Sequence, residues 1–186
     1  MAVEQFNLNA GQRAERKLLI TVAEWTEGSG QTATQNREIL GTRTPDSSID
    51  YNPDLETSTD IRGITYTDMN KTEPQQSFDP FLVLGGSKLG ALLNDIRRRN
   101  AYTELNQFTI YVITAFVGNS TDGYAAEKHE GCTITYESLG GDSNVNFPIT
   151  VHFSNSTAAT PGRPQTGTVN KLTEDFVFTA DVTIGG

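Results

Sequence analysis

The sequence of 186 residues is poor in the residue types that build most active sites and cross-links. It contains one cysteine, Cys132, and therefore cannot form a disulfide bond within the chain. It contains two histidines, His129 and His152, and neither lies in a spacing typical of a catalytic or metal-binding motif. With so little cysteine, synthesis inside a cell is the simpler expectation.

Long apolar runs are missing as well. The longest apolar stretch, residues 110–117, is far too short to span a membrane. The N-terminal stretch, MAVEQFNLNAGQR, has no apolar run of the kind that signal peptides carry. We therefore expect neither membrane insertion nor secretion.

Basic residues are outnumbered, with 14 lysines and arginines against 23 acidic residues, a formal net charge of −9 and a pI near 4.6. This balance argues against a surface that grips nucleic acid, but not against one past which nucleic acid must move without sticking. Hydrophobic residues make up only 35% of the chain. That figure suits a strand-rich chain with polar loops, or subunits that cover surface against copies of themselves.

One amphipathic helix is expected at Ser87–Arg99. Four aliphatic residues fall at positions i, i+3, i+4 and i+7 and so share one stripe: Leu89, Leu92, Leu93 and Ile96. Ser87 can cap the free N–H groups of the first turn. Arg97, Arg98 and Arg99 stand in the last turn, where cations suit the negative end of the helix dipole. Such a helix needs an apolar surface to lie on.

Most other segments alternate between apolar and polar residues with a period of two, which predicts strands with an inward and an outward face. These segments are residues 16–25, 108–113, 132–136, 145–153 and 176–184. In the first of them both faces are apolar, so both are expected to be covered. The sequence thus predicts a mainly β fold, a β-sandwich or barrel with one flanking helix, as a single domain over residues 1–186. Residues 27–35 and 154–167 are expected to be loops.

Residues 45–80 stand apart because they carry eight acidic and two basic residues, a net charge of −6. Strands are expected on both sides of Asn52-Pro53-Asp54, a turn sequence, and again after Met69-Asn70-Lys71. These strands are rich in Thr, Ser and Gln and bury little. We therefore predict a long polar β-hairpin region whose unpaired edges recruit other chains.

No set of residues supports an enzyme or a cofactor. Cys132 is expected to point inward as a small buried side chain, and His152 outward. His129 lies between Glu127 and Glu130 and could bind a metal weakly together with either of them, but the spacing matches no catalytic motif. The residues by themselves indicate a non-catalytic β-domain that works through its surfaces.

The order of these parts, with a strand, a polar hairpin region, a helix and then alternating strands, resembles the tail tube protein (major tail protein) of long-tailed bacteriophages and phage-derived tail particles. The resemblance spans residues 49–184. It rests on the order and texture of four stretches, namely residues 47–81, 87–100, 125–155 and 167–182.

The resemblance implies a structural virion protein without catalytic activity or cofactor. Copies would form rings, expected to hold six subunits, and the rings would stack into the hollow tail tube through which DNA passes during ejection. The implied partners are further copies of the chain, a tail tip or initiator protein and the tape measure protein. The protein would be made in the cytoplasm of the bacterial host and end in the virion tail.

In this scheme an acidic bore repels the phosphates of DNA. The candidate lumen residues are Glu56, Asp60, Asp68 and Glu73. The candidate contacts between subunits are Ile49, Tyr51, Arg97, Arg98 and Arg99. As an alternative, the acidic residues meet the three arginines of an adjacent subunit at a rim contact.

Two other functions stay open at this point. A tube of the same fold could belong to a DNA-free device, either a bacteriocin tail particle or a type VI secretion system. A β-sandwich module that binds carbohydrate or mediates adhesion is the third possibility. It would call for a secretion signal and a cluster of exposed aromatic residues, neither of which is evident.

Overall fold

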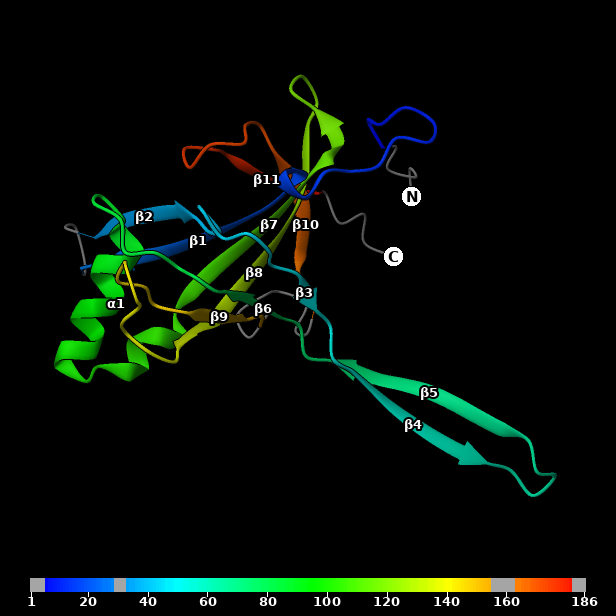
Figure 1. Ribbon diagram of the computed structural model, residues 1–186. Coiled ribbons are helices and arrows are strands. Elements are labelled where there is room, and N and C mark those ends of the chain that lie inside the picture. Colours follow the sequence, from blue (N-terminus) through cyan, green and yellow to red (C-terminus); the bar gives the residue numbers. More distant parts are fainter. Residues whose placement is uncertain (1–5, 29–32, 155–162, 182–186) are drawn as a thin grey trace.

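The structure is a computed structural model that describes residues 6–28, 33–154 and 163–181, and this part of the chain is mainly β with one α-helix (Figure 1). The helix α1 spans Lys88–Arg99, and the short 3-10 helices are η1 (Arg16–Leu18) and η3 (Tyr102–Asn106). The strands are β1 (Leu19–Glu27), β2 (Thr34–Ile39), β3 (Ile49–Asp50), β4 (Pro53–Thr59), β5 (Thr65–Thr72), β6 (Gln75–Phe78), β7 (Phe108–Asn119), β8 (Gly123–Tyr136), β9 (Ile149–His152), β10 (Gln165–Val169) and β11 (Phe178–Ala180).

The long strand β8 joins two antiparallel sheets. Its first half, residues 124–128, pairs with β10, and its last part, residues 133–136, pairs with β9. The strand order is β2-β1-β7-β8-β9-β6-β3, with β10 and β11 branching from β8. The predicted fold class, a β-sandwich with one flanking helix, is confirmed.

The larger hydrophobic cluster lies where α1 packs on the sheets. Helix residues Leu89, Leu93 and Ile96 are fully buried there, while Leu92 packs partly against the same cluster. Their partners come from five strands and the connecting segments, and include Trp25, Leu40, Phe78, Phe108, Ile110, Cys132, Ile134, Phe147, Ile149 and Val151. The apolar stripe predicted for the helix therefore does bury against the sheets.

The N-terminus of α1 is capped from two sides. Ser87, the residue before the helix, accepts a hydrogen bond from the Gly90 N–H at 3.0 Å, as the sequence predicts. Glu38 on β2 adds a second cap, because its carboxylate accepts from the Ser87 hydroxyl and from the Leu89 N–H, each at 2.8 Å. The negative charge also suits the positive end of the helix dipole.

A second hydrophobic cluster covers the opposite face of β1, β7 and β8. It contains Val22, Tyr111, Ile113 and Phe176, together with Ala126 and Val169. The first strand is therefore covered on both faces, as predicted. The same holds for β7, where alternation alone predicted a largely polar outer face, because the chain from β10 to β11 folds over Tyr111 and Ile113.

Two strands lie where loops were expected. Residues 34–35 begin β2, and residues 165–167 belong to β10; the rest of those expected loops includes residues 29–32 and 155–162, which lie outside the described part of the chain. The strand expected over 145–153 is shorter, since β9 begins at Ile149 and Val145 is exposed. The strand expected over 176–184 is described only to residue 181, and β11 covers three residues of it.

Candidate interaction surface

The polar hairpin region projects from the edge of the sandwich formed by β3 and β6. Its base is the pairing of β3 with β6, in which Ile49 opposes Gln76 and is half-buried. Beyond the base the chain changes direction at Asn52, which has a positive φ of 42°. The joint is closed by the Glu73 N–H, which donates to the Tyr51 carbonyl at 3.0 Å, and by the Asn52 side-chain amide, which donates to the Glu73 carbonyl at 3.1 Å. Tyr51 itself points into solvent.

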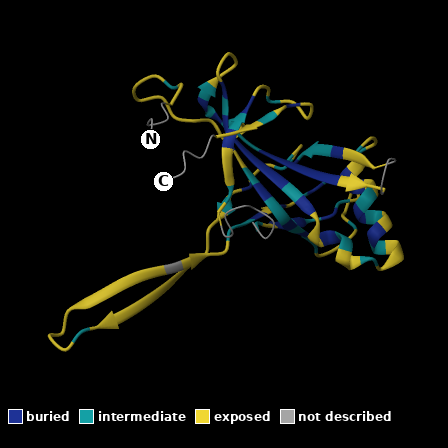
Figure 2. Cartoon of the chain, turned by 180° about the vertical axis from the view of Figure 1, so that it is seen from behind, coloured by how far each residue is buried: buried dark blue, intermediate teal, exposed yellow. Residues whose placement is uncertain are grey.

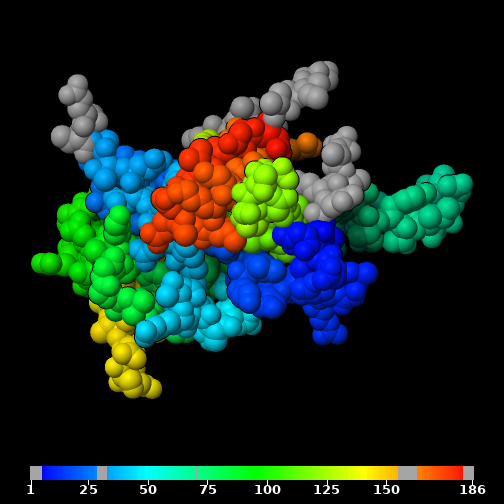
Figure 3. All heavy atoms as spheres, turned by 90° about the horizontal axis from the view of Figure 1, so that it is seen from above, coloured from blue at the N-terminus to red at the C-terminus, as the bar shows by residue number. Residues whose placement is uncertain are grey.

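Beyond this joint, β4 and β5 form a two-stranded hairpin that stands clear of the body (Figures 1 and 3). Every side chain of β4 is exposed, and Figure 2 shows the hairpin as an almost uninterrupted exposed arm. Within the described residues, β4 and β5 pair only with each other. Both outer edges therefore carry backbone N–H and C=O groups that no described strand satisfies.

The turn of the hairpin is not where the sequence predicted it. Pro53 begins β4, and Met69-Asn70-Lys71 lies inside β5, so neither predicted corner is a chain reversal. The chain reverses at residues 60–64, where one carboxylate oxygen of Asp60 accepts from the Arg62 N–H at 2.8 Å and the Ile64 N–H at 2.9 Å. The backbone bond from Ile64, with smaller contributions from Arg62, holds the pKa of Asp60 below its usual value.

The four acidic residues predicted to line a bore have different roles. Glu56 and Asp68 are direct cross-strand partners in the middle of the hairpin. Asp60 is a turn residue, and Glu73 lies at the base in an ion pair with Lys71 at 2.5 Å. The hydrogen bond and charge of Lys71 lower the pKa of Glu73. The structure thus brings two of the four candidates side by side.

Apolar side chains are also left in solvent on this arm. Leu55 and Met69 oppose each other across the strands, on the face opposite to the acidic pair, and are 58% and 63% exposed. Ile61 at the tip is fully exposed, and Ile64 and Tyr66 are about half exposed. Exposed apolar groups gathered on a projecting element are typical of a contact surface.

The three arginines predicted to contact another subunit lie at the end of α1, far from the hairpin (Figure 1). Arg99 is held within its own chain by Asp95 at 2.7 Å and Glu104 at 2.8 Å, and these carboxylates raise its pKa, Glu104 more than Asp95. Arg97 is half-buried and donates to the Asn94 side chain at 3.1 Å. Arg98 is exposed and makes no ion pair with any described residue, so it is the best placed of the three to meet another chain.

The single cysteine and the two histidines lie in different settings. Cys132 is fully buried, and burial raises the pKa of its thiol to about 11. His152 is exposed on its strand, as predicted. His129 is buried; its ring packs edge-on against Phe153 and lies 3.4 Å from the Glu127 carboxylate. Among the described residues no group of three or more His, Cys, Asp or Glu side chains is arranged to hold a metal ion.

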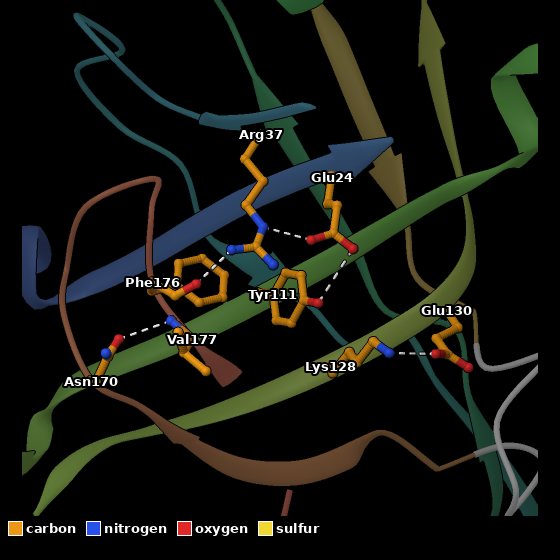
Figure 4. A network of polar contacts seen from close by, with 8 residues as sticks. All are labelled: Glu24, Arg37, Tyr111, Lys128, Glu130, Asn170, Phe176 and Val177. Carbon is orange, nitrogen blue, oxygen red and sulfur yellow. Dashed lines mark hydrogen bonds and ion pairs between the residues drawn. The ribbon is translucent and has the colours of Figure 1, made fainter. Parts of the chain in front are cut away.

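A buried polar network was not predicted from the sequence (Figure 4). Arg37 on β2 donates from Nε to the Glu24 carboxylate at 2.5 Å and from a terminal nitrogen to the Phe176 carbonyl at 2.6 Å. Its guanidinium lies 4.3 Å from the centre of the Phe176 ring. Burial raises the pKa of Tyr111 to about 12, so its hydroxyl stays protonated and donates to Glu24 at 3.4 Å. A glutamate inside the apolar run of β1 was the one available sign of such a network.

Comparison with protein families, curated proteins and solved structures finds no match to this chain. Of the helices in the described residues, none combines the length and apolar character needed to cross a membrane.

Proposed function

We propose that this protein is the subunit of a hollow tail tube. Copies close into rings of six, the rings stack head to tail, and the bore lets phage DNA pass during ejection. Contacts between unlike surfaces suit this architecture, because they close rings laterally and leave stacking open-ended. In the assembled particle the tube would meet a tail tip or initiator protein at one end and enclose the tape measure protein before ejection.

The observation that carries the proposal is the free-standing hairpin of β4 and β5. An isolated two-stranded hairpin is at best marginally stable in water. This one leaves both outer edges unpaired among the described residues and exposes Leu55, Ile61 and Met69. A neighbouring subunit would pair those edges and cover those side chains, and so turn a liability for aggregation into a defined assembly contact.

The charge distribution supports contact between copies. The hairpin is acidic, and helix α1, whose last turn carries the exposed Arg98, lies on the opposite side of the molecule (Figure 1). In a head-to-tail arrangement, the acidic hairpin of one copy meets the Arg98 side of the next copy. No contact within a single chain brings these two surfaces together. Assembly through such a contact weakens as salt rises, because exposed charge pairs are screened within about 8 Å at physiological ionic strength.

The acidic pair Glu56 and Asp68 supports a bore past which DNA slides. Two carboxylates per subunit, repeated around every ring, would give a continuous negative lining that repels phosphate. A tube of a DNA-free device, such as a bacteriocin particle or a type VI secretion system, would use the same subunit contacts. The cargo is therefore tested separately from the assembly.

Electron microscopy of the purified full-length chain, together with light scattering over a range of concentrations, tests the assembly. We expect rings or tubes from the wild-type protein, and monomers with an unchanged circular dichroism spectrum from the double variant Leu55→Ser with Met69→Ser. Val145→Ser, at a residue 53% exposed on the body, is the control. Tubes from the double variant would show that the hairpin is not the assembling element.

A wild-type chain that stays monomeric would next be mixed with tail tip complexes, to test whether an initiator templates the hairpin. If no tubes form even then, the tube proposal fails and a binding module becomes the leading interpretation.

A further inference from the structure

Strand β2 forms an outer edge of the sandwich. One backbone hydrogen bond shows which of its N–H groups face β1 and which face outward. The Leu40 N–H donates to the Thr21 carbonyl at 2.8 Å, so Leu40 faces β1. Backbone groups of an antiparallel strand alternate in direction, so Glu38 also faces β1 while Arg37 and Ile39 present their N–H groups outward. No strand in the described part of the chain pairs with this edge.

One of these outward groups is already occupied. The Ile39 N–H donates to a carboxylate oxygen of Glu174 at 3.3 Å, and Glu174 belongs to the loop between β10 and β11. Beside this contact lies a cavity of about 210 Å³. Its walls are β2 from residue 37 to 39, the segment 81–88 that leads into α1, and Glu174 itself. The edge of β2 therefore lies in a groove, and the loop reaches across one side of it.

The loop of residues 170–177 is held in this position by polar bonds and by Phe176, which packs in the second hydrophobic cluster. Arg37 donates to the Phe176 carbonyl and stacks on the Phe176 ring (Figure 4). Inside the loop the Val177 N–H donates to the Asn170 side chain at 2.8 Å. Phe176 is the only residue of 173–177 that is buried. Phe176 and the partly buried Leu172 stay packed in the second hydrophobic cluster, whereas residues 173–175 are exposed. This short segment, which carries Glu174, can therefore move away from β2 while the anchor and the strands stay in place.

We propose that residues 173–175, anchored by Phe176, form a latch that covers the edge of β2 through Glu174 and restrains self-assembly. This inference rests on the proposed function, since the occupant of the opened edge is an extended strand from a second copy. The same chain offers such strands: β4 and β5 each have an outer edge without a described partner. Opening the latch frees the Ile39 N–H and widens the groove, so that the edge of β2 can accept backbone bonds along its length.

Variants at Glu174 test the latch in the full-length protein. Glu174→Ala removes the acceptor, whereas Glu174→Gln keeps an acceptor oxygen without the charge. Glu137→Ala is the matched control, because Glu137 is an exposed glutamate whose side chain makes no hydrogen bond or ion pair with the described residues. The measurements are amide hydrogen exchange at Ile39 and the lag time of tube formation followed by light scattering.

We expect Glu174→Ala to speed exchange at Ile39 roughly two- to tenfold, the size expected for one lost hydrogen bond, and to shorten the lag, with Glu174→Gln close to wild type. Tubes from Glu174→Ala under conditions where the wild type stays monomeric would support the latch most directly.

Wild-type exchange and lag in Glu174→Ala would overturn the latch while leaving the tube proposal intact. If Glu137→Ala shortened the lag equally, a general loss of negative charge would explain the effect, and the latch would again be wrong. If no protein assembled, even with tail tip complexes, the proposed function would fail and the latch with it.

Discussion

Glu56 on β4 and Asp68 on β5 oppose each other directly across the projecting hairpin. Like charges at opposed positions of two strands destabilise the pair, by roughly 0.2–1 kcal/mol. The arrangement therefore works against the free hairpin. This cost is explained if, in the proposed tube, the pair gives the lining of the bore its negative charge.

Reversing both charges together tests this role. The double variant Glu56→Lys with Asp68→Lys keeps two like charges opposite each other, so the hairpin should be about as stable as before. The sign of the proposed lining changes, and lysines attract the phosphates of DNA. We expect tubes still to form through the apolar contacts of Leu55, Ile61 and Met69, although the charge contact with Arg98 is weakened. DNA release should be slower, measured with a DNA-binding dye on particles that carry the variant.

The control for this experiment is Glu137→Lys with Asp142→Lys, which makes the same change of net charge at exposed sites on the body. Release at the wild-type rate from particles with the reversed hairpin would mean that the pair does not face the bore. Slowed release from the control as well would point to net charge rather than to the lining.

The tip of the hairpin should respond to acid through Asp60. Its pKa is lowered in the folded turn, chiefly by the backbone bond from Ile64, relative to an ordinary value of 3.8. Ionised Asp60 therefore stabilises the turn at pH values above 3.8. This stabilisation is lost as the pH falls through the lower pKa of the folded state. We expect the amide signals of Arg62 and Ile64 to shift only once the pH falls below this ordinary value of 3.8, as followed by an NMR titration.

Asp60→Asn provides the comparison, because the amide oxygen still accepts both backbone bonds but does not titrate. A shift of the same size in Asp60→Asn would assign the acid response to another group.

Glu38 should contribute to stability out of proportion to its place on an edge strand, because it caps α1. Glu38→Ala removes the acceptor for the Leu89 N–H and the Ser87 hydroxyl, and a lost cap costs about 0.5–2 kcal/mol. Urea unfolding measures this loss, with Glu137→Ala as the matched control. Equal midpoints for the two variants would show that Ser87 suffices as the cap.

Arg37 should be one of the most sensitive positions in the chain. Arg37→Ala leaves the carboxylate of Glu24, which is 7% exposed, without its cation, and breaking such a pair costs about 3–5 kcal/mol. Combining Arg37→Met with Glu24→Gln removes both charges and should recover most of that loss. Thermal and urea unfolding of the single and double variants measure the coupling, and a loss below about 1 kcal/mol in Arg37→Ala would contradict a buried ion pair.

Local patterns identified the parts of the fold that depend on neighbours in sequence. The stripe from Leu89 to Ile96 and the cap at Ser87 predicted α1 to within one residue, because both signals are local and lie within the helix and its first cap. The position of the hairpin turn was missed for a related reason. Asn52-Pro53-Asp54 is a strong turn sequence, but the bonds that reverse the chain are those of Asp60.

Strand β2 was missed because its sequence, TQNREI, is polar and has no clear alternation. Without β2 there was no way to place Arg37 beside Glu24 or Glu38 at the start of α1. The second covered face of β7 was also missed, because the residues that cover it lie far along the chain. Tyr111 looks like an outward-facing residue until the segment after β10 folds over it.

The sequence by itself determined the mainly β character, the one helix and the unusual polarity of the region that became the projecting hairpin. Periodicity and composition carry these features within short windows. Only the tertiary structure decided which charges meet, which edges stay open and which loop guards them. Those contacts join distant residues, as when Arg37 binds the carbonyl of Phe176, 139 positions away. Their stability comes from burying groups together, and that burial exists only once the sheets have packed.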